Sequence, residues 1–88
     1  MQFIEEKLFV GGINYNTTED TIKELFSKYG KIIDLKLIRD RITGKSKGFA
    51  FITFELASEA FEARMGLNGF ELEGRNIGVK KARKKEME

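Results

Sequence analysis

Apolar side chains recur along the chain with two different spacings, which predict two helices and four strands. One stripe at the i, i+3, i+4, i+7 spacing predicts an amphipathic helix within residues 16–30 and consists of Ile22, Leu25, Phe26 and Tyr29. A second stripe predicts a helix within residues 58–69 and consists of Ala60, Ala63, Arg64 and Leu67. Short runs bounded by turn residues predict strands at residues 7–12, 31–40, 45–54 and 75–82.

The order strand, helix, strand, strand, helix, strand predicts an α+β fold of the ferredoxin-like βαββαβ type. Thr17 or Thr18 is the expected N-cap of the first helix and Gly30 its expected C-cap, and Asn68-Gly69 ends the second helix. Because both crossovers are right-handed, both helices pack on one face of a four-stranded antiparallel sheet. The other face of that sheet is predicted to be uncovered.

The strand at residues 45–54 is apolar on both of its faces. Side chains alternate between the two faces of a strand, so Ala50, Ile52 and Phe54 share one face while Phe49 and Phe51 share the other. The helices are expected to cover the aliphatic face, which the sequence assigns to Leu8, Val10, Leu35, Leu37, Ala50, Ile52, Phe54, Ile77 and Val79. Ile33 is expected on the same strand face as Leu35 and Leu37. Phe9 points to the same open face as Phe49 and Phe51, so three phenylalanines are predicted to cluster there.

The composition is that of a single small domain without the residues of common metal and nucleophile sites. The 88 residues contain no Cys and no His, which removes disulfides, most zinc and copper sites, and Ser-His or Cys-His pairs. Carboxylate catalysis and magnesium binding are not excluded by composition. No apolar run approaches the length of a membrane helix, so we expect an intracellular protein with no membrane partner, in the nucleus or the cytoplasm.

Basic residues flank the expected aromatic face. Five of the 16 basic residues fall in residues 80–85, and four more lie in residues 39–47 with Asp40 as the single acidic residue. Aromatic faces interleaved with lysines favour single-stranded nucleic acid, whose bases stack while its phosphates are held alongside. The alternatives are a protein partner with a peptide on this face, or coverage by this chain or a second copy. Further candidates from the sheet face are Lys7, Lys36, Ile38, Lys47 and Lys80.

Two motifs suggest nucleotide binding or carboxylate catalysis, but their sequence context does not support either. Thr43-Gly44-Lys45-Ser46 contains part of a phosphate loop, but Arg39 occupies the place of its first glycine and the segment joins two strands. The carboxylates near residues 19–24 lie at a helix start, where they complement the helix dipole. We therefore predict a protein that is not an enzyme, with no catalytic residue, no metal site and no cofactor.

Lys47–Phe54, "KGFAFITF", resembles the octamer signature of the RNA-recognition motif, and Leu8–Ile13, "LFVGGI", resembles its hexamer. The Gly-Gly-Ile variant is similar to the heterogeneous-nuclear-ribonucleoprotein A/B and Musashi-like groups. The resemblance implies a motif over residues 7–83, an N-terminal extension over 1–6 and a charged tail over 84–88. It implies single-stranded RNA as the partner, with single-stranded DNA as an alternative. The residues implied as base-stacking are Phe9, Phe49 and Phe51, the phosphate contact is Lys47, and the candidates for reading bases beyond the fourth strand are Lys80, Lys81 and Arg83.

The second helix carries two apolar side chains at the edge of its stripe. Phe61 and Met65 stand where polar residues are commoner, and their i, i+4 spacing predicts a locally packed pair. A weak protein contact on this side is the alternative, and otherwise we expect a monomer. Arg64 is expected to cover core surface with its aliphatic stem.

Overall fold

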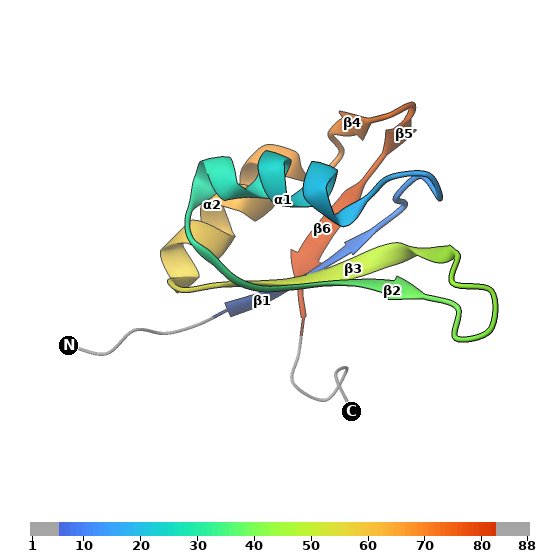
Figure 1. The fold of residues 1–88 in the computed structure, drawn as a ribbon. Helices are drawn as coiled ribbons and strands as arrows, with labels where there is room; N and C mark the ends of the chain where they lie inside the picture. The colour runs from blue at the N-terminus through green and yellow to red at the C-terminus, as the bar shows by residue number, and fades with distance from the viewer. Residues whose placement is uncertain (1–5, 83–88) are drawn as a thin grey trace.

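Two helices cover one face of a four-stranded antiparallel sheet in the computed structural model, which describes residues 6–82 (Figure 1). The strands β1 (Glu6–Gly11), β2 (Ile32–Arg39), β3 (Ser46–Phe54) and β6 (Gly78–Lys81) lie in the order β2-β3-β1-β6. Helix α1 (Glu19–Phe26) and helix α2 (Ala57–Leu67) lie on the same side of this sheet. The predicted ferredoxin-like arrangement is confirmed, and β1 and β3 are its central neighbours.

The core lies between the helices and the aliphatic face of the sheet. Side chains of β1, β3 and β6 alternate, and the positions that face the helices are buried, whereas their neighbours, Thr53 excepted, are partly or largely exposed. From β1 and β3 alone, Leu8, Ala50, Ile52 and Phe54 are 0 % exposed. The buried apolar residues are Leu8, Val10, Ile13, Ile22, Phe26, Leu37, Ala50, Ile52, Phe54, Ala60, Ala63, Leu67, Ile77 and Val79.

The placement of Ile33 on the core face was wrong. Ile33 is 42 % exposed, whereas Ile32 packs against the core. The register between β2 and β3 shifts here, because Ile32 lies opposite Phe54 and Asp34 lies opposite Thr53. One extra residue in β2 forms a bulge, and Leu35 returns to the core side beyond it.

Helix α1 begins as predicted and ends earlier. Thr18 is its N-cap and accepts a hydrogen bond from the Thr21 amide at 3.4 Å. The chain then continues through a 3₁₀ turn, η1 (Ser27–Tyr29), which ends at Gly30. The backbone of Gly30 is extended, with φ of 164°, so Gly30 is not the left-handed cap expected of helix α1. A Cβ atom there would collide with the Glu59 side chain, so glycine at this position provides space.

The single strand predicted at residues 75–82 is divided in two. β4 (Glu71–Leu72) and β5 (Arg75–Asn76) form a separate hairpin, and β6 joins the main sheet only from Gly78. The two residues of the hairpin turn, Glu73 and Gly74, have φ of 49° and 88°, as a type I′ turn requires. Ile77 lies between β5 and β6 and is buried, as predicted.

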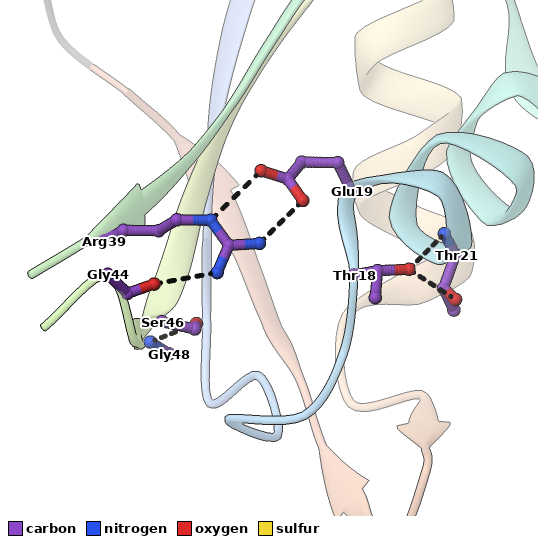
Figure 2. Close-up of polar contacts among 7 residues, drawn as sticks. All are labelled: Thr18, Glu19, Thr21, Arg39, Gly44, Ser46 and Gly48. Carbon is purple, nitrogen blue, oxygen red and sulfur yellow. Dashed lines mark hydrogen bonds and ion pairs between the residues drawn. The ribbon is translucent and has the colours of Figure 1, made fainter.

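Polar contacts hold the loop between β2 and β3 and join it to the start of α1 (Figure 2). Arg39 donates to both carboxylate oxygens of Glu19, at 3.3 and 2.8 Å, and to the Gly44 carbonyl at 3.1 Å. The carboxylate of Asp40 accepts the backbone N–H groups of Ile42 and Thr43, at 2.8 and 2.9 Å. Strand β3 follows directly, so the Gly-Lys-Ser segment does not precede a helix.

Removal of core volume from β3 should destabilise the domain more than the same change at the β2 bulge. Ile52→Ala leaves a cavity beneath the helices and should cost about 2–5 kcal/mol. Ile33→Ala, as the matched control, should cost less than about 1 kcal/mol, because its side chain is largely in solvent. Urea unfolding followed by circular dichroism measures both free energies, and equal losses would contradict the assignment of the two faces.

The contacts of the Glu19 and Asp40 carboxylates should make the stability of the fold decrease as the pH becomes acidic. The hydrogen bonds from Arg39 hold the pKa of Glu19 below its ordinary value of 4.5, and those from the Thr43 and Ile42 amides hold the pKa of Asp40 below 3.8. A carboxylate with a lowered folded pKa stabilises the fold above its unfolded pKa and loses that contribution as pH falls through its folded pKa. The combined variant Glu19→Gln/Asp40→Asn should therefore melt below wild type near about pH 7, and the difference should shrink toward about pH 2. A gap in melting temperature that stays constant over this range would contradict the prediction.

Candidate nucleic-acid interface

Three phenylalanines form one cluster on the face of the sheet that the helices leave uncovered. The ring centroids of Phe9 and Phe51 are 5.5 Å apart, those of Phe9 and Phe49 5.6 Å, and those of Phe49 and Phe51 6.3 Å. The rings are tilted or edge-on to one another, which is the geometry that aromatic quadrupoles favour. All three side chains are partly exposed, so ring surface stays available to a ligand. We call these three residues the aromatic cluster.

The strand register extends this cluster into a row that crosses all four strands. Phe9 lies opposite Phe51 on one side and opposite Lys80 on the other, and Phe51 lies opposite Lys36. The row therefore runs Lys36, Phe51, Phe9, Lys80 from edge to edge, over roughly 14 Å at the usual strand spacing. The Lys80 ammonium lies 5.4 Å from the centroid of the Phe9 ring, a cation–π distance. Two cations thus stand at the ends of an aromatic pair.

The remaining predicted contacts on this face lie along β1, β2 and β3. Lys7 precedes Phe9 by two residues on the same face, opposite Thr53, and is partly exposed. Ile38 is also partly exposed, two residues after Lys36. Lys47 is exposed at the start of β3, two residues before Phe49. Phe9 owes its position to Gly11, because a Cβ atom at Gly11 would lie 3.0 Å from the ring of Phe9.

One of the predicted contacts does not join this face, and another lies outside the described residues. Lys81 lies opposite Leu8, so it projects toward the helix side of the sheet, and its ammonium is 3.8 Å from the Glu6 carboxylate. A one-residue step along a strand reverses the direction of the side chain, and this separates Lys81 from Lys80. Arg83 lies outside the described residues.

Tyr15 is a candidate that the strand pattern missed. It lies in the loop between β1 and α1 and is 66 % exposed. Its ring lies over Gly48, where an added Cβ atom would approach the ring to 3.1 Å. Gly48 directly precedes Phe49, and Tyr15 lines a cleft together with Thr18, Arg39 and Lys45. An aromatic residue just after the Gly-Gly of β1 was the signal available in the sequence.

The lysines of this face form no ion pair with a carboxylate in the part of the chain that the structure describes. Within residues 6–82 the ion pairs are Arg39 with Glu19 and Lys81 with Glu6. Lys7, Lys36, Lys47 and Lys80 therefore have no carboxylate partner among those residues. The same range contains no cluster of three potential metal ligands and no helix long and apolar enough to cross a membrane.

The helix side carries a smaller exposed feature. Phe61 and Met65 are 48 % and 61 % exposed on α2. The Arg64 guanidinium lies 5.5 Å from the centroid of the Phe61 ring, so this ring has a cation–π contact within its own helix. The Arg64 side chain is partly buried, in line with the stem packing expected for it.

Comparisons with known proteins agree with this geometry. A family model described as the RNA recognition motif matches residues 8–78. "Glycine-rich RNA-binding protein 5, mitochondrial" of Arabidopsis thaliana is 55 % identical over 73 residues, which are 83 % of this chain and 25 % of that protein. The chain therefore spans about a quarter of the length of that relative.

Solved structures with similar folds include one described as the RNA15 RRM, with a TM-score of 0.88 and 34 % identity over 94 % of this chain and 95 % of that one. Another is the Rna15 RRM with bound RNA (GU), with a TM-score of 0.80 and 37 % identity over 86 % of this chain and 81 % of that one. The family match includes both signature segments, on the two central strands of the sheet. The chain belongs to the RNA recognition motif family.

Proposed function

We propose that this domain binds a short segment of single-stranded RNA on the open face of its sheet, without catalysis. The observation that carries the proposal is the aromatic cluster, which lies partly exposed between lysines that have no carboxylate partner within residues 6–82. An exposed apolar patch with a basic rim suits unpaired bases and their phosphates. The RNA-binding relative and the RNA-bound structural neighbour support RNA as the class of ligand.

The bases stack on Phe9, Phe49 and Phe51 in this proposal. A base that stacks on Phe9 has to compete with Lys80, whose ammonium lies near the same ring. An exposed cation–π contact is worth about 0.5–1 kcal/mol, whereas a stacked base contributes about 1–3 kcal/mol. The base therefore displaces the ammonium, and Lys80 is then available to a phosphate at the edge of the sheet.

The phosphates contact Lys7, Lys36, Lys47 and Lys80, and Tyr15 extends the surface beyond Phe49. Two or three stacked bases with a few phosphate contacts supply roughly 8 kcal/mol, which corresponds to a Kd near 1 μM. Stacking accepts every base, so discrimination between sequences should be modest. Single-stranded DNA has the same bases and phosphates, and its binding is an outcome that the titration below decides.

The protein acts as a monomer in this proposal, and its location inside the cell stays a prediction. The plant relative is named as mitochondrial, which is a third compartment beside the nucleus and the cytoplasm.

Loss of the stacking rings should weaken RNA binding while the fold is kept. Phe49→Ala/Phe51→Ala should reduce affinity for a random RNA pool by at least about tenfold, because each stacked base contributes about 1–3 kcal/mol. Phe61→Ala is the matched control, since it removes a half-exposed ring from the helix side, and it should bind as wild type does. Fluorescence anisotropy with the RNA pool and its DNA counterpart measures the affinities, and circular dichroism checks the fold.

A folded double variant that binds as tightly as wild type would contradict base stacking on this face. Amide resonances of the sheet that shift with a peptide partner and with no nucleic acid would instead support a protein-binding module.

The affinity for RNA should fall moderately as the salt concentration rises. A protein that neutralises a few phosphates of a single strand loses affinity with a slope of about −0.7 per phosphate in log Kobs against log salt concentration. Four lysine contacts therefore give a slope near about −2 to −3. Lys36→Gln should make the slope shallower by about 0.7, whereas Lys81→Gln should leave it nearly unchanged, because Lys81 lies on the other face. Equal slope changes for the two variants would contradict the assignment of phosphate contacts to the open face.

A further inference from the structure

Glu73, in the turn of the β4–β5 hairpin, bonds at two points to the loop between β1 and α1. Its carboxylate accepts the Thr17 hydroxyl, and its carbonyl accepts the Asn14 side-chain amide at 3.0 Å. Glu73 is 56 residues from Thr17 and 59 residues from Asn14 along the chain. The hairpin and the loop meet because both lie at the same end of the molecule (Figure 1).

Glutamate is not a residue that this turn favours. Glu73 has φ of 49° and is the one residue other than glycine with a positive φ among residues 6–82. The first central position of a type I′ turn favours Asn, Asp or Gly, because these residues tolerate the left-handed backbone best. A residue with a longer side chain keeps such a backbone only where its surroundings hold it there. The turn therefore does not explain the glutamate, whereas its reach to Thr17 does.

The bonds to Glu73 hold the part of the loop that carries Tyr15. The Asn14 carbonyl accepts the Thr17 amide, and the Asn14 side-chain oxygen accepts the Asn16 amide, both at 2.9 Å. Thr17 is 2 % exposed, so its hydroxyl needs an acceptor within the protein. Glu73 is thus bonded to the residues at both ends of the short turn in which Tyr15 lies.

The Tyr15 side chain depends on this backbone for its direction. The side chain is 66 % exposed, so few contacts restrain it directly. Its ring lies over Gly48, where an added Cβ atom would approach the ring to 3.1 Å. A ring that is mostly in solvent points where its own backbone directs it. Loss of the bonds to Glu73 would therefore free the ring from its place over Gly48.

We propose that Glu73 is a positioning residue for RNA binding, which holds the β1–α1 loop from the hairpin so that the Tyr15 ring can stack a base. Glu73 acts through Tyr15 and does not itself contact the RNA. This inference rests on the proposed function, in which Tyr15 extends the RNA surface beyond Phe49.

The test combines two substitutions at Glu73 with the loss of the Tyr15 ring. Glu73→Asn introduces a residue that the turn favours but is shorter by one methylene, so it should keep the fold and lose the bond to Thr17. Glu73→Gln keeps the length and a side-chain oxygen that can accept the Thr17 hydroxyl. Glu71→Asn is the matched control, because Glu71 is exposed on β4 of the same hairpin and loses the same charge.

Fluorescence anisotropy with the random RNA pool measures the affinities. Tyr15→Ala should weaken binding about tenfold, which is the scale of one stacked base. Glu73→Asn should weaken binding about threefold, and the double variant should bind no more weakly than Tyr15→Ala, because both changes remove the same contribution. Glu73→Gln and Glu71→Asn should bind as wild type does.

Nuclear magnetic resonance reports the position of the ring without RNA. The ring current of Tyr15 acts on the Cα protons of Gly48, because the ring lies against that residue. Glu73→Asn should therefore move the Gly48 resonances toward their positions in Tyr15→Ala, whereas Glu71→Asn should leave them in place.

The inference is overturned if Glu73→Asn binds as wild type does, if its effect adds to that of Tyr15→Ala, or if its Gly48 resonances do not move. It is also overturned if Glu73→Gln is as weak as Glu73→Asn, or if Glu71→Asn loses as much affinity. If Tyr15→Ala binds as wild type does while the double phenylalanine variant does not, the positioning role fails and the proposed function stands. If wild type binds no RNA, the proposed function itself fails.

Discussion

Adjacent residues of β3 belong to opposite environments, and this alternation determines what the rest of the molecule can do. Ala50, Ile52 and Phe54 are 0 % exposed beneath the helices, whereas Phe49 and Phe51 stand between them on the open face. A domain of 88 residues has two helices for one sheet, so one face is covered and the other is not. The same strand thereby carries the core and the proposed ligand surface, and neither can shift in register without the other.

The cost of leaving three phenylalanines outside the core is reduced by their contact with one another. Centroid separations of 5.5 to 6.3 Å mean that each ring covers part of its neighbours. Lys80 covers part of Phe9, and the space above Gly11 accommodates the same ring. The cluster is therefore partly buried in the free protein and still presents ring surface to a base. This arrangement explains how a small domain keeps a partly exposed apolar cluster while it stays folded.

Periodicity was sufficient to predict the elements and the open face, because both follow from which side chains lie on the same side. The element order follows from the spacing of apolar residues, the central pair β1 and β3 from the usual connection order of this fold, and the shared face of the three phenylalanines from alternation along the strands. The errors occur where parity is interrupted. The β2 bulge moves Ile33 out of the core side, and the Glu73-Gly74 turn separates the β4–β5 hairpin from β6.

Contacts between segments that are distant in the sequence could not be predicted, for a different reason. Gly30 resembles a helix cap until the position of Glu59 on α2 is known, and only the fold brings these two residues together. Tyr15 is an isolated aromatic residue in a loop, and its place beside Gly48 depends on how that loop folds back over β3. A pattern along one segment contains no information on such pairs, so these residues had to be found in three dimensions.

The polar contacts of the molecule are concentrated at the end of the sheet near Phe49. The Ile13 amide donates to the Gly48 carbonyl at 2.9 Å, and the Gly48 amide donates to the buried Ser46 hydroxyl at 3.0 Å (Figure 2). Nearby, the Thr17 hydroxyl donates to the Glu73 carboxylate, and the Asn14 side-chain amide donates to the Glu73 carbonyl at 3.0 Å.

These bonds tie the β1–α1 loop to the β4–β5 hairpin, while Arg39 ties the β2–β3 loop to α1. Both loops are thus held by hydrogen bonds to neighbouring elements. Because a surface held in one conformation loses little entropy on binding, such loops would lower the cost of the RNA binding proposed for the neighbouring sheet face.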